Sequence, residues 1–241
     1  LSISDKISFI LTQSIPGAIF SLELASSQTN SIQNDNNQTS TDIIDLDGTN
    51  DFIQISNFTS VDTISNLTIT SWVSPDYSKG SAEFSVISKE NLFKLSINNK
   101  INPQQIAKFS IFDGITWTDV ESTAPINEKW THLGATFNGT TMQLYVDGNL
   151  SSTTQMSGQL ELDVHGKLVT TTIDEISSDQ DIVVGAAINS KKQFEKISNQ
   201  FSGQIDDIFL YTEQLDAYEI QLLYKQKQAH YDALNIEFDI E

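Results

Sequence analysis

The residues with catalytic potential are carboxylates at the end of the chain. Glu237, Asp239 and Glu241 alternate with apolar residues, so on a β-strand all three would share one face. Paired carboxylates at such spacing can serve as nucleophile and general acid in glycoside hydrolysis. They stand at the extreme C-terminus, after a predicted helix, where no cleft would surround them. We therefore interpret the run as the solvated face of a charged strand and predict no catalytic residue.

Histidine and tryptophan give weaker signals. His132 lies in a predicted strand, His165 and His230 lie in polar surroundings, and no Ser or Asp stands at a spacing typical of a catalytic triad. The three tryptophans could form a sugar-stacking platform, but each aromatic ring buries a large apolar surface, so at least two are expected to fill the core. Trp117 lies beside a predicted turn and is the residue that we predict to contact a ligand.

The composition narrows the classes of partner. The chain has 32 acidic and 13 basic residues and a formal net charge of -19, so its field repels phosphate backbones and anionic lipids. Neither nucleic acid binding nor direct membrane insertion is expected. Every basic residue is Lys, which removes bidentate guanidinium contacts, and there is no Cys to form a disulfide or to ligate zinc. The chain starts at Leu1 rather than Met, which indicates a processed or excised chain.

A β-hairpin stands at the centre of the sequence. Residues 131–137 and 141–146 alternate in polarity on either side of Asn138-Gly139, and the second run ends in Asp147-Gly148. Asn-Gly and Asp-Gly between alternating runs are the strongest short-range signals of hairpin turns. This stretch therefore predicts three consecutive antiparallel strands.

Short apolar or alternating runs, separated by Gly, Asn, Pro or Asp, occupy most of the remaining chain. Residues 155–180 are predicted to be an insertion with one small hairpin, residues 26–42 a surface loop, and residues 215–224 a helix. Further strands are expected at 1–15, 18–24, 45–55, 67–73, 83–88, 92–97, 106–112, 117–121, 181–186, 201–211 and 233–241. Strands at this spacing predict an all-β sandwich or barrel.

Five of these segments together resemble the laminin G-like, concanavalin A-like lectin-glucanase superfamily. They are LDGTNDFIQI, LTITSWV, EKWTHLGATFNGTTMQLYVDGN, VVGAA and SGQIDDIFLYTEQLDAYEIQLLY. The resemblance implies a two-sheet antiparallel jelly-roll sandwich over residues 17–227, with one short C-terminal helix. It also implies an extracellular protein at the cell surface that binds glycans or proteins. Extra terminal β-strands are then left at 1–16 and 228–241.

Members of this superfamily often hold a calcium ion at the rim of the sandwich. The resemblance implies Glu23, Asp47, Asp206 and Asp207 as candidate ligands, and calcium prefers several such oxygen donors. The competing interpretation is that some Asp must cluster in so acidic a chain. By strand parity, at least one of Asp206 and Asp207 would then lie in solvent.

Asn-Xaa-Ser/Thr triplets mark candidate glycosylation sites of a secreted glycoprotein. They occur at Asn37, Asn57, Asn66, Asn138 and Asn149.

The two terminal strands need a sheet to join, because their backbone groups and apolar faces are otherwise unsatisfied. They could pair within the subunit, insert into a neighbouring copy to build a head-to-tail filament or surface layer, or belong to adjoining domains of one surface protein. The leading hypothesis is a non-enzymatic, extracellular module with a structural or adhesive role that self-assembles by strand exchange. The alternative is a calcium-dependent carbohydrate-binding lectin module, and a glycanase is a distant third.

Overall fold

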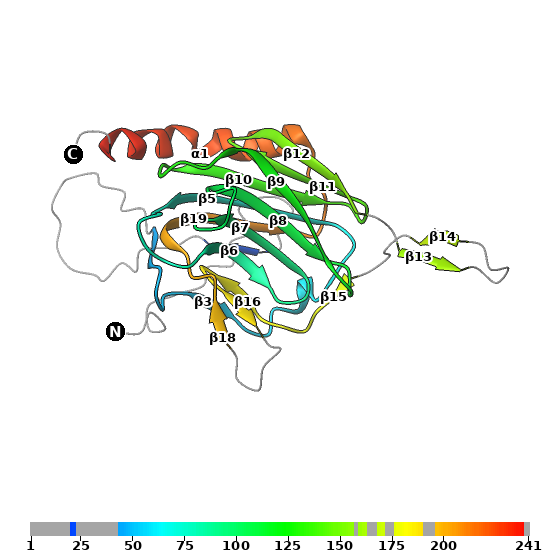
Figure 1. Ribbon diagram of the computed structural model, residues 1–241. Helices are drawn as coiled ribbons and strands as arrows, with labels where there is room; N and C mark the ends of the chain where they lie inside the picture. The colour runs from blue at the N-terminus through cyan, green and yellow to red at the C-terminus, as the bar shows by residue number, and fades with distance from the viewer. Residues whose placement is uncertain are drawn as a thin grey trace.

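The computed structural model describes residues 20–22, 43–156, 159–162, 168–171, 176–189 and 196–238. Two antiparallel sheets pack face to face in these ranges, as the predicted sandwich requires, and one helix lies outside them (Figure 1). Within the described ranges, no helix has both the length and the apolar character needed to cross a membrane.

One sheet has seven strands. Its order is β1 (Phe20–Leu22), β19 (Ser202–Tyr211), β5 (Leu67–Pro75), β10 (Thr131–Phe137), β11 (Thr141–Val146) and β12 (Asn149–Gln155), and β2 (Ile44–Asp47) also pairs with β19. The predicted central hairpin is confirmed, since β10 pairs with β11 across Asn138-Gly139 and β11 pairs with β12 across Asp147-Gly148. Asp147 and Gly148 both have positive φ, at 48° and 72°, as a tight hairpin turn of this kind requires.

The other sheet has six strands. Its order is β3 (Ile53–Ile55), β16 (Ile182–Val184), β6 (Glu83–Lys89), β7 (Phe93–Asn98), β8 (Ile106–Phe112) and β9 (Trp117–Pro125). Strand alternation builds the core between the sheets: on β7, Phe93, Leu95 and Ile97 point inward and are fully buried, whereas Lys94 and Ser96 point outward.

Smaller elements surround the sandwich. The hairpin predicted within 155–180 is confirmed as β13 (Gln159–Leu162) with β14 (Leu168–Thr171). The 3-10 turn η2 (Thr59–Val61) precedes β4 (Thr63–Ile64), which pairs with β15 (Ile176–Ser177), and β17 (Ala187–Asn189) pairs with β18 (Lys196–Ser198). The strand predicted at 1–16 and the loop predicted at 26–42 lie outside the described residues.

The helix α1 (Ala217–Phe238) begins with a capping box. Oδ1 of Asp216 accepts the backbone N–H groups of Tyr218 and Glu219, at 2.8 and 2.9 Å, and Oε2 of Glu219 accepts the N–H of Asp216 at 2.8 Å. These bonds satisfy donors that the first helical turn leaves free, and they set the start of the helix.

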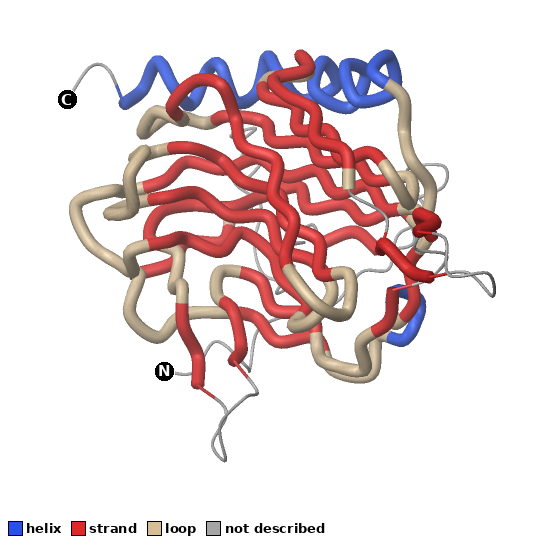
Figure 2. Tube along the Cα trace, turned by 45° about the vertical axis from the view of Figure 1, so that its right-hand side comes forward, coloured by secondary structure: helices blue, strands red, loops and turns tan. Residues whose placement is uncertain are grey.

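The helix packs on the outer face of the seven-stranded sheet (Figure 2). Its Tyr231 is fully buried against Trp72 and Trp130 of the sheet, so two of the three tryptophans pack inside, as predicted. Gly134 lies under the first turns of α1, and a Cβ there would stand 3.1 Å from a methyl carbon of Ile220. A glycine at this position therefore lets the helix approach the sheet closely.

The predicted C-terminal strand at 228–241 is wrong, because α1 continues to Phe238. Its period-2 alternation is compatible with a strand, but packing on the sheet favours the helix. Asn235 attaches this end of α1 to the backbone of Trp130. Its Oδ1 accepts the N–H of Trp130 at 2.7 Å, and its Nδ2 donates to the Trp130 carbonyl at 3.2 Å. Tertiary contacts thus outweigh the local pattern.

The longer helix also changes the interpretation of the carboxylates at the end of the chain. Glu237 belongs to α1, while Asp239 and Glu241 lie outside the described residues. The three carboxylates therefore do not follow one strand with a common face, which was the premise for considering them as a glycosidase pair.

Candidate ligand-binding face

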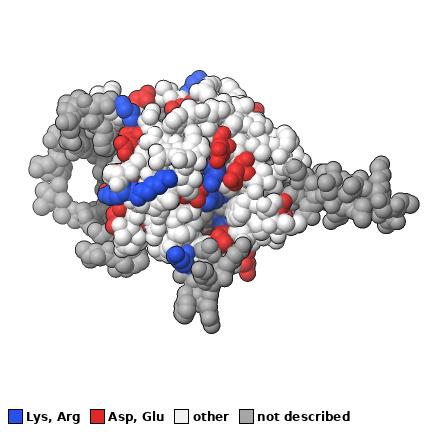
Figure 3. Space-filling model, viewed as in Figure 1, with Lys and Arg blue, Asp and Glu red and all other residues white. Residues whose placement is uncertain are grey.

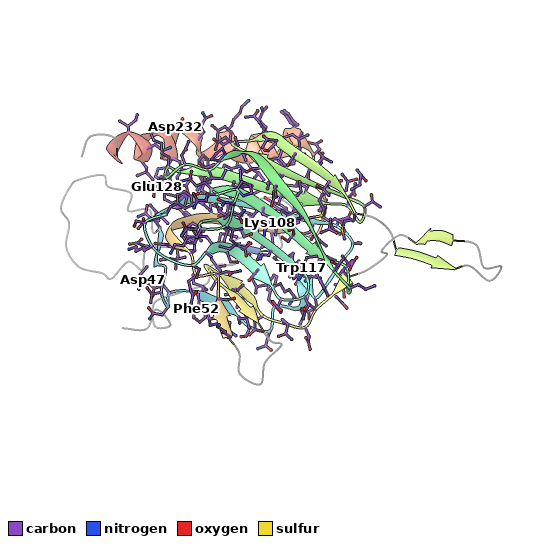
Figure 4. The ribbon with its side chains drawn as sticks, viewed as in Figure 1. Asp47, Phe52, Lys108, Trp117, Glu128 and Asp232 are labelled. Atoms are coloured by element: carbon purple, nitrogen blue, oxygen red, sulfur yellow. The ribbon has the colours of Figure 1, made fainter. Side chains whose placement is uncertain are left out.

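Charged side chains gather on the outer face of the six-stranded sheet. They come from the outward positions of adjacent strands: Glu83 on β6, Lys94 on β7 and Lys108 on β8. Figure 3 shows lysine and acidic side chains meeting in the middle of this face, and Figure 4 labels Lys108 and Trp117 on it.

Glu83 is the centre of this group. Its Oε1 accepts hydrogen bonds from Ser96 Oγ at 2.8 Å and from Lys108 Nζ at 2.9 Å. Its Oε2 accepts from Lys94 Nζ and Asn199 Nδ2, both at 2.9 Å. A carboxylate offers about four acceptor positions, so the four donors saturate it.

The two lysines decide the charge state of Glu83. Burial acts to raise the pKa of this carboxyl, but the attraction of Lys94 and then Lys108 outweighs it and leaves the pKa below its ordinary value. Burial likewise acts to lower the pKa of Lys108, and Glu83 more than compensates, so that pKa is raised. Glu83 and Lys108 are therefore both ionised at neutral pH, and the carboxylate fixes the two lysine side chains on this face.

A pocket of about 200 Å³ opens next to the network. The residues that line it include the apolar Phe93, Trp117 and Ile188 and the polar Lys94 and Asn199. The remaining lining comes from Ser88, Lys89, Glu90, Ala187 and Ser198.

Trp117 is an exposed aromatic residue of this pocket. It is 39% exposed, and its ring lies 5.3 Å from the ring of Phe112, measured between centroids, which supports it from one side. An exposed indole face next to fixed polar groups can stack on one side of a small ligand while those groups accept or donate hydrogen bonds.

Asp206 and Asp207 lie on the other sheet, beneath α1. A β-bulge in β19 places both side chains on the outer face, because Asp207 adopts a left-handed φ of 48°. Only 8% and 4% of the two residues is exposed, so the expectation that one of them lies in solvent is wrong. The phenol oxygen of Tyr231 lies 2.9 Å from Asp206 Oδ2 and 3.0 Å from Asp207 Oδ2, and Lys227 Nζ lies 3.2 Å from Asp207.

The two carboxylates of Asp206 and Asp207 compete for the phenol proton of Tyr231. A phenol donates a single proton, so it cannot donate to both carboxylates at once. Burial, followed by the negative charge of Asp207, raises the pKa of Asp206 to about 6. When protonated, Asp206 can donate to the phenol oxygen while Tyr231 donates to Asp207.

This raised pKa predicts a pH-dependent stability. In the unfolded chain the aspartate pKa is near 3.8. The folded state therefore loses stability as pH rises from the unfolded pKa through the folded pKa of about 6. We expect the contribution of Asp206 to make the protein about 1 kcal/mol more stable at pH 5 than at pH 7. In Asp206→Asn this part of the dependence should disappear, as measured by urea unfolding at both pH values.

The control for this prediction is Asp45→Asn, which makes the same change of charge at an exposed position. Asp45→Asn should show the same difference in the free energy of unfolding between pH 5 and pH 7 as the unmodified chain. An Asp206→Asn protein with an unchanged difference would show that other groups cause it.

The candidate calcium ligands are not brought together. Asp47 is the exposed last residue of β2, and its Oδ1 accepts the N–H of Thr49 at 2.7 Å. It pairs with Ser202 on β19, four residues before Asp206, which corresponds to roughly 13 Å along a strand. Glu23 lies outside the described residues, and within the described part of the chain no three metal-ligating side chains form a group. Asp47 therefore does not form one site with Asp206 and Asp207, and calcium binding stays a prediction.

His132 is buried under α1 and burial lowers its pKa to about 3, so it is neutral at physiological pH. His165 lies outside the described residues.

Of the glycosylation candidates, Asn57, Asn138 and Asn149 are exposed and Asn66 is partly exposed. Asn37 lies outside the described residues, and glycosylation stays a prediction.

Sequence reasoning singled out Trp117, whose contact with a ligand stays a prediction, but it missed the charge network beside it. Glu83 and Lys94 are separated by 11 residues, and Glu83 and Asn199 by 116. The available signal was that Glu83 begins one largely apolar strand, and that Lys94 and Lys108 each interrupt another, all at outward positions. Without the strand order and register, that signal does not say that the three side chains meet.

Comparisons with known proteins agree with this architecture. The family profile described as "Concanavalin A-like lectin/glucanases superfamily" matches residues 47–221. No curated protein matches the chain in sequence.

Among solved structures, a CBM40 domain of the Ruminococcus gnavus IT-sialidase bound to α2,3 sialyllactose is 15% identical, with a TM-score of 0.59 over 86% of this chain and 99% of that one. A pentraxin from Limulus polyphemus is 14% identical, with a TM-score of 0.54 over 73% and 78%. The botulinum neurotoxin serotype D binding domain is 18% identical, with a TM-score of 0.56 over 88% and 51%. At this identity the likenesses establish the fold.

Proposed function

Because the chain belongs to the concanavalin A-like lectin/glucanases superfamily, we propose that it is a non-enzymatic carbohydrate-binding module. In this proposal, a sugar ring stacks on Trp117 and its hydroxyl groups bond to polar side chains of the adjacent pocket. The single observation that carries the proposal is the partly exposed Trp117 side chain at a pocket whose residues Lys94 and Asn199 are held in place by Glu83.

Similar solved structures support a ligand of this class. The CBM40 domain, which has a similar fold, holds sialyllactose. A pocket of about 200 Å³ that combines Trp117 with several polar residues suits one sugar ring of a longer glycan.

The charges favour a neutral sugar. The lysines that line the pocket are Lys89 and Lys94, which are already paired with Asp62 and Glu83 at 2.8 and 2.9 Å. The whole chain carries a net charge of -19, which repels anionic ligands. We therefore propose an uncharged glycan, unlike the sialylated ligand of the CBM40 domain.

An adhesive role at a cell surface follows as the wider proposal. A domain that binds neutral glycans without transforming them can attach its parent protein to glycoconjugates or polysaccharides. The exposed glycosylation triplets are compatible with an extracellular setting.

Substitution of Trp117 tests the proposal. On an array of neutral and sialylated glycans, we expect the unmodified chain to bind a subset of the neutral ones. Trp117→Ala should weaken that binding about tenfold or more, the equivalent of about 1.4 kcal/mol, because the stacking surface is lost. Isothermal titration with the best neutral glycan gives the affinities.

Ile115→Ala is the matched control, since Ile115 is an exposed apolar residue of the same turn but does not line the pocket. It should bind as the unmodified chain does. Equal binding by Trp117→Ala, or binding restricted to sialylated glycans, would contradict the proposed site. The same titration in EDTA tests the calcium prediction, because loss of binding would show that glycan binding requires a metal ion.

A further inference from the structure

The outer face of α1 carries apolar residues that nothing in the described chain covers. Tyr218, Leu222 and Ile236 are 67%, 42% and 61% exposed, and they are three of the seven large hydrophobic side chains that are exposed among the described residues. With Ala229 and Ala233 they lie within about 40° of one direction on a helix of 3.6 residues per turn. We call these five residues the outer stripe.

The outer stripe points directly away from the sheet. Ile220 and Tyr231, which are fully buried, lie on the opposite side of the same helix. Figures 1 and 2 show α1 as a separate layer at the outside of the sandwich, so a partner helix could lie along it without meeting either sheet. Apolar side chains at this spacing are typical of a helix that packs against another helix.

We propose that the outer stripe pairs with the same stripe of a second copy, with the two α1 helices antiparallel and the twofold axis at Ala229. This arrangement places Leu222 of each copy against Ile236 of the other, seven residues on either side of the axis. The small side chain of Ala229 lets the helices approach closely at the crossing point. The proposal does not rest on the carbohydrate-binding function.

Charge complementarity identifies a second copy as the occupant. Lys225 lies four residues before Ala229 and Asp232 three residues after it, and both lie on the same flank of the outer stripe. In the antiparallel pair, Lys225 of each copy therefore faces Asp232 of the other, which gives two equivalent ion pairs. A symmetric interface of this kind requires a surface that is complementary to itself, and this one is.

The size of the interface predicts a weak dimer. Residues 218–236 span about 27 Å of helix, so the contact is smaller than a standard protein interface. We expect association at micromolar or higher concentration, where a dimer would present two glycan sites and increase binding to a multivalent surface by avidity.

Sedimentation velocity from low to high micromolar concentration tests the proposal. We expect reversible dimerisation that Leu222→Asp weakens more than about tenfold, because a charge enters the apolar contact. Lys225→Glu and Asp232→Lys should each weaken it about three- to tenfold by placing like charges together. The double variant Lys225→Glu, Asp232→Lys should restore the original affinity, since it exchanges the two charges.

Ile101→Asp is the control, because Ile101 is an exposed apolar residue away from α1. Circular dichroism of each variant establishes that the fold is retained. A monomer at every concentration would overturn the proposal and leave the outer stripe to an adjoining domain or another protein. A dimer that Ile101→Asp weakens as much as Leu222→Asp, or that the double variant does not restore, would overturn it as well.

Discussion

Replacing Tyr231 with Ala is expected to lower the free energy of unfolding by about 3 to 4 kcal/mol. The ring of Tyr231 is fully buried and stacks on Trp72 with 4.1 Å between ring centroids, and it lies 4.8 Å from the ring of Trp130. Its removal leaves a cavity between α1 and the seven-stranded sheet. It also takes away the phenol that bridges the buried carboxyls of Asp206 and Asp207.

Urea unfolding followed by tryptophan fluorescence measures the loss, and hydrogen exchange shows where it acts. Exchange of the α1 amides should accelerate more than that of β10, because the helix loses its main anchor. Tyr231→Phe separates the two contributions: it keeps the stacked ring and should cost only about 1 to 2 kcal/mol at pH 7.

Tyr218→Ala is the matched control on the same helix. Tyr218 is exposed, so its removal from the monomer should cost less than about 0.5 kcal/mol. If Tyr231→Ala is no more destabilising than this control, α1 is not held to the sheet through Tyr231.

The second large effect is expected from Glu83→Gln, which should destabilise the fold by about 2 to 3 kcal/mol at pH 7. The amide replaces a carboxylate that receives Lys94, Lys108, Ser96 and Asn199. Two largely buried ammonium groups then lose their counter-charge. Because these lysines hold the pKa of Glu83 below its ordinary value, the stabilisation is present above the carboxyl's unfolded pKa. It falls as pH decreases through the folded pKa.

Chemical denaturation at pH 7 and at acid pH provides the measurement. Glu121→Gln changes the same charge at an exposed position of β9 and should have little effect. Adding Lys108→Gln to Glu83→Gln should recover part of the loss, since it removes one unpaired cation. The same stability for Glu83→Gln and Glu121→Gln would mean that the network does not stabilise the fold.

Glu83→Gln should also weaken glycan binding, because Glu83 positions Lys94 and Asn199 in the pocket wall. The affinity of the folded variant can be measured under conditions where it is fully native. If Glu83→Gln destabilises the fold but binds the glycan as strongly as the unmodified chain does, the ligand does not depend on Lys94 and Asn199.

Prediction from sequence succeeded where the signal is local. Alternating runs and Asn-Gly or Asp-Gly turns specify β10, β11 and β12, because strand period and turn conformation depend on adjacent residues. It failed where packing decides between two local options. Alternation after residue 233 is compatible with a strand, yet the contacts of Tyr231 and Asn235 with the sheet keep that segment helical.

The acidic pair shows the same limit. Parity predicts that consecutive Asp206 and Asp207 point to opposite faces, but the bulge and the left-handed backbone at Asp207 turn both toward α1. Strand parity holds only while the register is continuous, and an inserted bulge residue is not visible in the alternation.

By itself, the sequence determined the class of the fold, the central hairpin and the exposure of Trp117 beside its turn, because each depends on short-range pattern and composition. The tertiary structure decided which groups meet. Strand register brings Glu83 to Lys94, Lys108 and Asn199, and the docking of α1 covers Asp206 and Asp207 while exposing the outer stripe. These contacts join residues far apart in the chain, and only the packed sheets set their positions.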